Sequence, residues 1–342
     1  LIAITGSCGK TTTKEITSSM LSSKFKVLKS LHNYNNLIGL PLTLFNLTHK
    51  EEVIVVEMGM SHPGEIKRLA EIAQPDIAVV TNVGRAHIGF FNSLKDVAKA
   101  KAELYRSSPR PKISILNRDD KFFSYFLSII DGEKITFGTN RKSDFRAEKI
   151  TFDSFGRASF YLNGKRKVKL PFLGRGNIYN VLASLAIASS MGMEIEEIIS
   201  SLSKVVLLPG RSNLSKMNGV YILDDTYNAN PSSFNNLLET IESIKVKGKK
   251  ILVLGDMLEL GKDVEEEHIK AGKLISNSSI DVLITIGEKT EFTAKATSGN
   301  RKVWYFNDQD NARKKLKGLL DKGDLLVIKG SRAMGMEKFL PC

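Results

Sequence analysis

A glycine-rich segment near the start of the chain has the residue types that bind phosphate. It reads Gly-Ser-Cys-Gly-Lys-Thr-Thr-Thr over residues 6–13 and follows a short apolar run. Glycines allow backbone N–H groups to surround an anion, and the N-terminus of a following helix adds partial positive charge. Lys10 can reach the β- and γ-phosphates of a nucleotide, and the Thr11 hydroxyl can bind Mg²⁺. The glycine spacing is shorter than the common one, so the alternative is a chance turn before a helix. The flanking strand and helix patterns favour the phosphate loop.

Two further polar side chains follow apolar runs that are typical of buried strands. Glu57 ends the run Val53–Val56, and His87 follows the run Ile77–Val80 after a short connection. The carboxyl ends of parallel strands face the ligand crevice of an open α/β sheet, and a carboxylate there suits Mg²⁺. A solvated glutamate and a structural histidine are the alternatives. Judged only by its spacing in the predicted helix, Lys101 is one of several solvated lysines.

Three polar stretches in the second half of the chain each follow an apolar run. They are Asp-Asp-Thr-Tyr-Asn-Ala-Asn-Pro (224–231), Gly-Asp-Met-Leu-Glu-Leu-Gly (255–261) and Lys-Gly-Ser-Arg (329–332). If the apolar runs are parallel strands, all three stretches lie at the same edge of one sheet. Each stretch alone is also consistent with a turn rich in Asx residues. Their shared position favours loops that bind a ligand.

The elements that must position these residues alternate between strand and helix. Strands are predicted at residues 1–5, 53–56, 77–80 and 113–116, and helices at 10–23, 62–73 and 93–106. Short links between alternating elements indicate a doubly wound parallel sheet. The runs are apolar throughout, as expected of strands that are buried on both faces. The first half of the chain is therefore predicted to be an α/β domain built around a phosphate loop.

The pattern then changes twice along the chain. Alternating residues over 143–170, with an Asn163-Gly164 turn, predict an antiparallel hairpin extension. Helices are predicted at 177–191 and 194–203, and Pro209-Gly210 marks a boundary. Strands at 220–223, 251–254, 282–286, 303–306 and 325–328 then predict a second, Rossmann-like α/β domain. We therefore expect domains at 1–208 and 209–342.

Composition narrows the class of protein. The chain has 342 residues, of which 42% are hydrophobic and 25% charged, and a net charge of +13. Its lysines are not interleaved with aromatic residues, so we expect no nucleic-acid partner. We see no apolar run long enough for a membrane helix and no signal peptide, and we expect no membrane insertion. Cys8 and Cys342 are the only cysteines, which fits a reducing cytoplasm. The chain opens in a strand pattern without Met, so we expect residues upstream of it.

Several of these motifs together resemble the Mur ligase family. Residues 6–15, Gly-Ser-Cys-Gly-Lys-Thr-Thr-Thr-Lys-Glu, are similar to the phosphate loop of that family. The other similar stretches are 33–41 (Asn-Tyr-Asn-Asn-Leu-Ile-Gly-Leu-Pro), 56–59 (Val-Glu-Met-Gly), 81–83 (Thr-Asn-Val) with His87, and 210–211 (Gly-Arg). The resemblance covers nearly the whole chain. It implies an ATP-dependent ligase that joins a carboxylate to an amine through an acyl-phosphate.

The resemblance also implies roles for the matching residues. The phosphates of ATP would be bound by Gly6, Ser7, Cys8, Gly9, Lys10, Thr11 and Thr12, with Thr11 and Glu57 at Mg²⁺ and His87 at a second Mg²⁺. Lys101 matches the family's carbamylated lysine, whose carbamate assists a divalent ion. Lys10, His87 and Lys101 would therefore be catalytic. Asn180 would contact adenine, Arg211 phosphate and Asp225 the ribose. Asn35, Asn36, Tyr227, Asn228, Ser331 and Arg332 would meet the substrates or the nucleotide.

Within the family, the three polar stretches of the second half, with Met336-Glu337, resemble the member that adds D-alanyl-D-alanine to UDP-MurNAc-tripeptide. Those two molecules would be the substrates, and we expect a monomer. Two departures stand out. Gly176 replaces the histidine that usually precedes the adenine-contacting helix, and the family's domain before the phosphate loop is not in this sequence.

Other functions remain open at this stage. A folylpolyglutamate synthase or another Mur ligase would share the phosphate loop, Glu57 and His87. A P-loop NTPase switch without ligase chemistry is a rival from another class, and a basic nucleic-acid-binding protein is a third. Phosphate release that depends on both substrates separates a ligase from a switch. Oligonucleotide binding with a steep salt dependence would favour the third reading.

Overall fold

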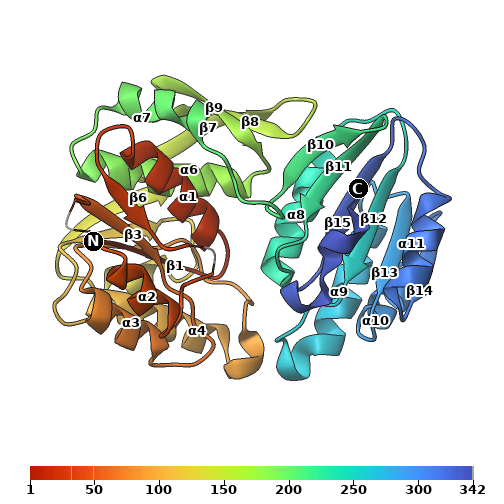
Figure 1. Ribbon diagram of the computed structural model, residues 1–342, viewed down its shortest axis with the longest axis horizontal. Helices are drawn as coiled ribbons and strands as arrows, with labels where there is room; N and C mark the ends of the chain where they lie inside the picture. The colour runs from red at the N-terminus through yellow and green to blue at the C-terminus, as the bar shows by residue number, and fades with distance from the viewer. Residues whose placement is uncertain (32, 49, 341–342) are drawn as a thin grey trace. The chain divides into compact units, whose positions relative to one another are not determined.

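The chain folds into two compact units, each built around one sheet (Figure 1). The structure is a computed structural model that describes residues 1–31, 33–48 and 50–340; Cys342 lies outside them. The first unit comprises Leu1–Thr151, Ala158–Pro171 and Gly176–Leu207, and the second comprises Phe152–Arg157, Phe172–Arg175 and Leu208–Cys342. The longest segment of the second unit starts at Leu208, whereas the sequence-based expectation for the second domain starts at residue 209. Two short segments that precede Leu208 also belong to that second unit.

The sheet of the first unit has nine strands. In spatial order they are β2 (Val27–Lys29), β3 (Val53–Glu57), β1 (Ile2–Thr5), β4 (Ile77–Val80), β5 (Ile113–Asn117), β6 (Glu133–Gly138), β7 (Phe145–Phe152), β8 (Arg157–Leu162) and β9 (Arg166–Leu173). Neighbours from β2 to β7 pair in parallel. The predicted doubly wound sheet is confirmed, although β2 and β6 were not predicted. Asn163 and Gly164, between β8 and β9, both have positive φ, at 49° and 71°, as a tight hairpin turn requires.

Helices cover both faces of this sheet. Helix α1 (Lys10–Leu21) packs against α6 (Gly176–Ser190) on one side, and α3 (Glu65–Ala73) lies near α4 (Leu94–Ala102) on the other (Figure 1). The unit also contains α2 (Gly39–Phe45), α5 (Phe123–Leu127), α7 (Ile195–Ser201), η1 (Ile88–Phe90), η2 (Glu103–Arg106) and η3 (Leu202–Lys204). The helix predicted from residue 62 begins only at Glu65, because Gly64 has a φ of 90°. The helix predicted over 93–106 divides into α4 and the 3₁₀ turn η2.

The sheet of the second unit has six strands. In spatial order they are β10 (Asn213–Met217), β11 (Val220–Asp225), β15 (Leu325–Lys329), β12 (Lys250–Gly255), β13 (Val282–Ile286) and β14 (Lys302–Phe306). All neighbours pair in parallel except β10 and β11, which form an antiparallel hairpin. The predicted Rossmann-like arrangement is confirmed. Strand β10 was missed, although the Asn218-Gly219 pair that closes its hairpin is a turn signal.

Helices again cover both faces of this second sheet. They are α8 (Pro231–Ser243), α9 (Val264–Ser276), α10 (Thr290–Ala296) and α11 (Gln309–Lys317), with the 3₁₀ turns η4 (Gly261–Asp263), η5 (Arg332–Met334) and η6 (Met336–Phe339). Helix α11 and η6 share one apolar cluster with residues of β12, β13 and β15. Helix α8 begins with a capping box between Asn230 and Ser233, which fixes the end of the preceding loop. Within the described ranges, no helix has both the length and the apolar character that crossing a membrane requires.

Candidate active site

The glycine-rich loop between β1 and α1 has a backbone that side chains would block. Gly6 and Gly9 have φ angles of 151° and 82°. A Cβ atom on Gly6 would lie 1.8 Å from Oγ1 of Thr81, and one on Gly9 would lie 2.2 Å from Oδ1 of Asn180. Lys10, the first residue of α1, donates from Nζ to the carbonyl oxygen of Gly6 at 3.0 Å. The lysine amine is thus held over the loop, as phosphate binding requires.

The segment that follows β4 braces this loop. The N–H of Cys8 donates to Oδ1 of Asn82 at 3.0 Å, and the Thr81 hydroxyl donates to the carbonyl oxygen of Cys8 at 2.6 Å. The N–H of Gly84 donates to Oγ of Ser7 at 2.8 Å. These bonds hold the loop backbone without occupying Lys10. The sequence marked the 81–83 stretch only as part of a resemblance, so this bracing role was missed.

Thr11 and Glu57 meet in the buried space at the start of α1. The Thr11 hydroxyl donates to Oε2 of Glu57 at 2.7 Å, and Nδ2 of Asn35 donates to Oε1 at 2.8 Å. Glu57 is only 3% exposed. A hydroxyl and a carboxylate are hard oxygen donors, which is the donor set that Mg²⁺ takes beside nucleotide phosphates. Among the described residues, no group of three or more His, Cys, Asp or Glu side chains could hold a metal ion. The Thr11 hydroxyl and the Glu57 carboxylate fit Mg²⁺ that is also bound by phosphates and water.

A buried lysine that the sequence did not single out supports Glu57. Lys14 is fully buried and donates from Nζ to the carbonyl oxygen of Ser30 at 2.6 Å. Its Nζ also lies 3.1 Å from Oε1 of Glu15, whose carboxylate pairs with Lys29. The N–H of Glu57 in turn donates to Oγ of Ser30 at 3.1 Å. Helix α1 therefore fixes the strand end that carries the carboxylate.

Lys101 lies near the C-terminal end of α4 and is only 3% exposed. Burial lowers the pKa of Lys101 well below its usual range, and the positive charge of Lys10 lowers it further. Asp120 interacts electrostatically with Lys101, and burial raises the pKa of that carboxyl. Oδ2 of Asp120 accepts the N–H of Val83 at 2.7 Å. The environment therefore favours the neutral, nucleophilic form of the Lys101 amine, and Asp120 is a neighbour that the sequence missed.

The remaining candidates of the first unit take separate positions. His87 precedes η1 with a left-handed φ of 56°. Oδ1 of Asn180 accepts the Thr13 hydroxyl at 3.3 Å, which places Asn180 beside the phosphate loop. Gly176, where the resemblance leads us to expect histidine, is the first residue of α6. Oδ1 of Asn36 accepts the N–H groups of Ile38 and Gly39 at 3.1 and 2.8 Å, so this side chain orders the start of α2.

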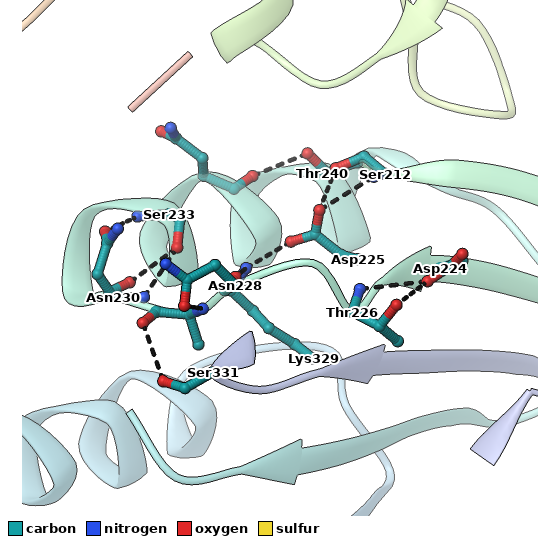
Figure 2. A network of polar contacts seen from close by, with 12 residues as sticks. Ser212, Asp224, Asp225, Thr226, Asn228, Asn230, Ser233, Thr240, Lys329 and Ser331 are labelled. Atoms are coloured by element: carbon teal, nitrogen blue, oxygen red, sulfur yellow. Dashed lines mark hydrogen bonds and ion pairs between the residues drawn. The ribbon is translucent and has the colours of Figure 1, made fainter. Parts of the chain in front are cut away.

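In the second unit, the three polar stretches lie at one sheet edge, as predicted. They follow β11, β15 and β12, which are adjacent parallel strands. Oδ1 of Asp225 accepts the N–H and the hydroxyl of Ser212 at 3.0 and 2.9 Å, and Oδ2 lies 2.6 Å from Nζ of Lys329 (Figure 2). The N–H of Ser331 donates to the carbonyl oxygen of Asp256 at 3.1 Å. The edge is therefore a connected polar network.

The guanidinium groups of two arginines lie near the ring of Tyr227. The Arg211 guanidinium carbon lies 3.7 Å from the ring centroid, and that of Arg332 lies 5.9 Å from it. The N–H of Gly210 donates to Oδ2 of Asp224 at 3.0 Å, which fixes the segment before Arg211. Residues that are far apart in the sequence thus place two positive charges at this edge. Such an arrangement suits a ligand with phosphate or carboxylate groups.

The fold and these sites define an α/β enzyme that has a phosphate loop in its first unit and a Rossmann-like second unit. Residues 4–188 match the Mur ligase middle domain, and residues 210–332 match the family described as Mur ligase, glutamate ligase domain. The chain belongs to the Mur ligase family and is an ATP-dependent amide ligase.

The most informative relatives are named for one reaction. The UDP-N-acetylmuramoyl-tripeptide–D-alanyl-D-alanine ligase of Bacillus subtilis is 34% identical over 99% of this chain and 75% of its own length. The Escherichia coli ligase of the same name is also 34% identical over the same shares. The crystal structure of MurF from Acinetobacter baumannii superposes with a TM-score of 0.91 at 30% identity, over 99% of this chain and 75% of that one. MurF from Thermotoga maritima, solved with ADP, has a TM-score of 0.88 at 31% identity, over 99% and 78% of the two chains.

Proposed function

We propose that this protein joins D-alanyl-D-alanine to the terminal carboxylate of UDP-MurNAc-tripeptide, a step of peptidoglycan precursor synthesis. The observation that carries this proposal is the edge of the second sheet, where three polar loops form one network beside two guanidinium groups. The relatives that are 34% identical carry this activity in their names. The phosphate loop, together with Lys10, Thr11 and Glu57, supports the use of ATP as a substrate. A related structure was solved with ADP.

The reaction balances as two transfers. A carboxylate oxygen of the tripeptide attacks the γ-phosphorus of ATP, the bond to the bridging oxygen breaks, and ADP leaves. The amine nitrogen of D-alanyl-D-alanine then attacks the acyl carbon and loses a proton, and inorganic phosphate departs. The loop N–H groups and Lys10 hold the phosphates in line during the first transfer. Mg²⁺, held by Thr11 and Glu57, would neutralise charge on the phosphates.

Lys101 has a separate role in the proposal. Desolvation lowers the pKa of its buried amine, and the neutral form of the amine attacks the carbon of CO₂ and releases a proton, which leaves an anionic carbamate. A carbamate supplies the oxygen donors that a lysine lacks, and Mg²⁺ prefers such donors. His87 would serve a second Mg²⁺. This part of the proposal is supported by the burial and lowered pKa of Lys101.

The other assignments stay predictions. Asn180 would contact adenine, Arg211 a phosphate and Asp225 the ribose. Asn35, Asn36, Tyr227, Asn228, Ser331 and Arg332 would meet the substrates or the nucleotide. Monomeric state, a cytoplasmic location and the absence of a nucleic-acid partner are also predictions.

The test is phosphate release from ATP with UDP-MurNAc-tripeptide and D-alanyl-D-alanine, supplied together and singly. The wild-type protein is compared with Lys10→Ala and with Lys26→Ala, an exposed lysine outside the loop. The Bacillus subtilis relative is the positive control. We expect release only with both substrates, with a product whose mass equals the joined peptide. The Lys10→Ala variant loses the release and the Lys26→Ala variant keeps it. Release that ignores both substrates would instead support an NTPase module.

A further inference from the structure

Lys329, the last residue of β15, is a lysine that is only 1% exposed at the ligand edge of the second sheet. Its Nζ lies 2.6 Å from Oδ2 of Asp225 and donates to the carbonyl oxygen of Asn228 at 2.9 Å (Figure 2). Asp225 ends β11, and Asn228 lies in the loop that follows it. One amine therefore fixes both the carboxylate at the strand end and the course of the next loop.

The burial of Lys329, beside a carboxylate that is 14% exposed, constrains how the two side chains can be arranged. A buried ammonium is tolerated only when charge and hydrogen-bonding partners surround it, and removing one partner leaves the other charge uncompensated. The second oxygen of Asp225 is already bound by the N–H and hydroxyl of Ser212. The rotation of the carboxylate is thus set from both sides. Charge-assisted bonds of this kind are shorter and stronger than neutral ones.

The residues directly after Lys329 connect the third loop. The hydroxyl of Ser331 accepts the N–H of Leu258 at 2.8 Å, and the N–H of Ser331 donates to the carbonyl oxygen of Asp256. The N–H of Arg332 reaches Oδ1 of Asn228 at 3.4 Å. The loops after β11, β12 and β15 therefore meet around the Lys329-to-Arg332 segment, and Lys329 is its only member with a full charge inside the protein.

We propose that Lys329 is a positioning residue that holds Asp225 and the 226–230 loop in the arrangement that binds nucleotide and amine substrate. This inference rests on the proposed function for the roles of Asp225, Ser331 and Arg332. Lys329 acts through these residues and does not itself touch the reacting atoms. Its loss should weaken the binding of ATP and of D-alanyl-D-alanine, and should spare the binding of UDP-MurNAc-tripeptide.

Lys249 provides a matched control within the same unit. It lies just before β12, at the opposite edge of the sheet. Its Nζ donates to Oδ2 of Asp321 and to the carbonyl oxygen of Leu319, both at 2.9 Å, and lies 3.7 Å from Oδ2 of Asp324. Its side chain is 40% exposed, so its ion pair is screened. Lys249→Met therefore removes an ion pair and a bond to a carbonyl oxygen, as Lys329→Met does, but away from the ligand loops.

The experiment compares Lys329→Met, Lys329→Arg and Lys249→Met with the wild-type protein. We expect Lys329→Met to raise the KM for ATP and for D-alanyl-D-alanine by roughly tenfold or more, since small misplacements of binding groups have effects of that size or larger. The KM for UDP-MurNAc-tripeptide and all constants of Lys249→Met should stay within about twofold of wild type. Lys329→Arg keeps the charge with a different geometry, so it should retain the fold and still raise the same two KM values.

Hydrogen–deuterium exchange and ADP affinity are measured on the same proteins and do not depend on turnover. Peptides covering residues 226–230 and 331–335 should exchange faster in Lys329→Met, with strands β11 and β15 unchanged, and ADP should bind more weakly. Equal effects of Lys329→Met and Lys249→Met would reduce Lys329 to a stabilising residue and overturn the inference. So would unchanged exchange and unchanged ADP affinity in both Lys329 variants. If the wild-type protein fails to join the two substrates, the proposed function falls, while the exchange and ADP data still decide the role of Lys329.

Discussion

The Thr11 hydroxyl donates a 2.7 Å hydrogen bond to the Glu57 carboxylate, although 46 positions separate the two residues. The bond joins the first turn of α1 to the end of β3. It forms because β3 and the neighbouring β1 are parallel, so their carboxyl ends lie at one edge. A donor set for Mg²⁺ thus depends on strand pairing.

Replacing Glu57 by glutamine should weaken the response to Mg²⁺. The amide oxygen can still accept the Thr11 hydroxyl, but the negative charge that attracts the ion is gone. We expect the Mg²⁺ concentration for half-maximal ADP binding to rise by roughly tenfold or more. Calorimetric titration of ADP at several Mg²⁺ concentrations measures this. The Glu71→Gln variant, on the surface of α3, should match wild type. An unchanged Mg²⁺ dependence in Glu57→Gln would remove Glu57 from the metal site.

Replacing Gly9 by alanine should abolish tight nucleotide binding. Its φ is 82°, and the new Cβ would lie 2.2 Å from Oδ1 of Asn180, so the loop or the asparagine must move. Gly64→Ala is the matched control. Gly64 also precedes a helix with a φ of 90°, but no atom lies within 4 Å of its Cβ position. The control should lose only about 1–2 kcal/mol of stability, from the left-handed backbone. Equal ADP affinity in the two variants would contradict the contact at Gly9.

Lys101→Met should stabilise the protein at neutral pH while it abolishes ligase activity. Burial lowers the pKa of Lys101 in the folded state, whereas the unfolded value is near 10.5. The lysine therefore gains a proton on unfolding, and the stability of the wild-type protein rises with pH up to about 10.5. The advantage of the methionine variant should shrink over that range.

Urea unfolding in CO₂-free buffer at several pH values measures the stability of the Lys101 variant. The neighbouring, exposed Lys99 provides the control, since Lys99→Met should change neither stability nor activity appreciably. Bicarbonate should restore activity to CO₂-depleted wild-type protein and leave Lys101→Met inactive. If Lys101→Met is less stable than wild type at neutral pH, then burying the Lys101 amine does not lower the free energy of unfolding as predicted.

His268 should make the second unit sensitive to mild acid. Its ring is fully buried, with Nδ1 2.7 Å from the carbonyl oxygen of Val264 and Nε2 accepting the N–H of Met257. Nε2 must therefore be unprotonated in the folded state. Burial lowers the pKa of His268 below its ordinary 6.5. Its contribution to stability is present above about pH 6.5 and is lost as the pH falls through the folded-state pKa.

The His268→Gln variant tests this acid sensitivity. It should be less stable than wild type at pH 7.5, yet its free energy of unfolding should fall less steeply below about pH 6.5, because one titrating group is gone. Urea titrations at fixed pH values give both slopes. The exposed His62 is the control, and His62→Gln should keep the wild-type slope. Parallel slopes for wild type and His268→Gln would show that another group titrates.

The sequence determined those features that residue types and short-range order encode. Apolar runs identified the buried parallel strands, because strands covered on both faces need no polar positions. The phosphate loop was readable because glycines, lysine and threonine stand next to one another. The three polar stretches were correctly placed at one edge, since each follows a parallel strand. Strands β2, β6 and β10 were not predicted, because short edge segments and segments of mixed polarity carry little periodic signal.

Only the tertiary structure decided which distant side chains meet. The sequence did not show that Lys14 and Lys329 are buried or that Asp120 lies beside Lys101, because these environments follow from how α1, β15 and the segment after β5 pack. The segment Phe152–Arg157 belongs to the second unit, where Phe155 forms a β-bridge with Ile244. No local sequence pattern predicts this pairing. The sequence thus determined the chemical groups and the strands that carry them. Strand order and burial determined their partners and their charge states, because both arise from contacts between residues far apart in the chain.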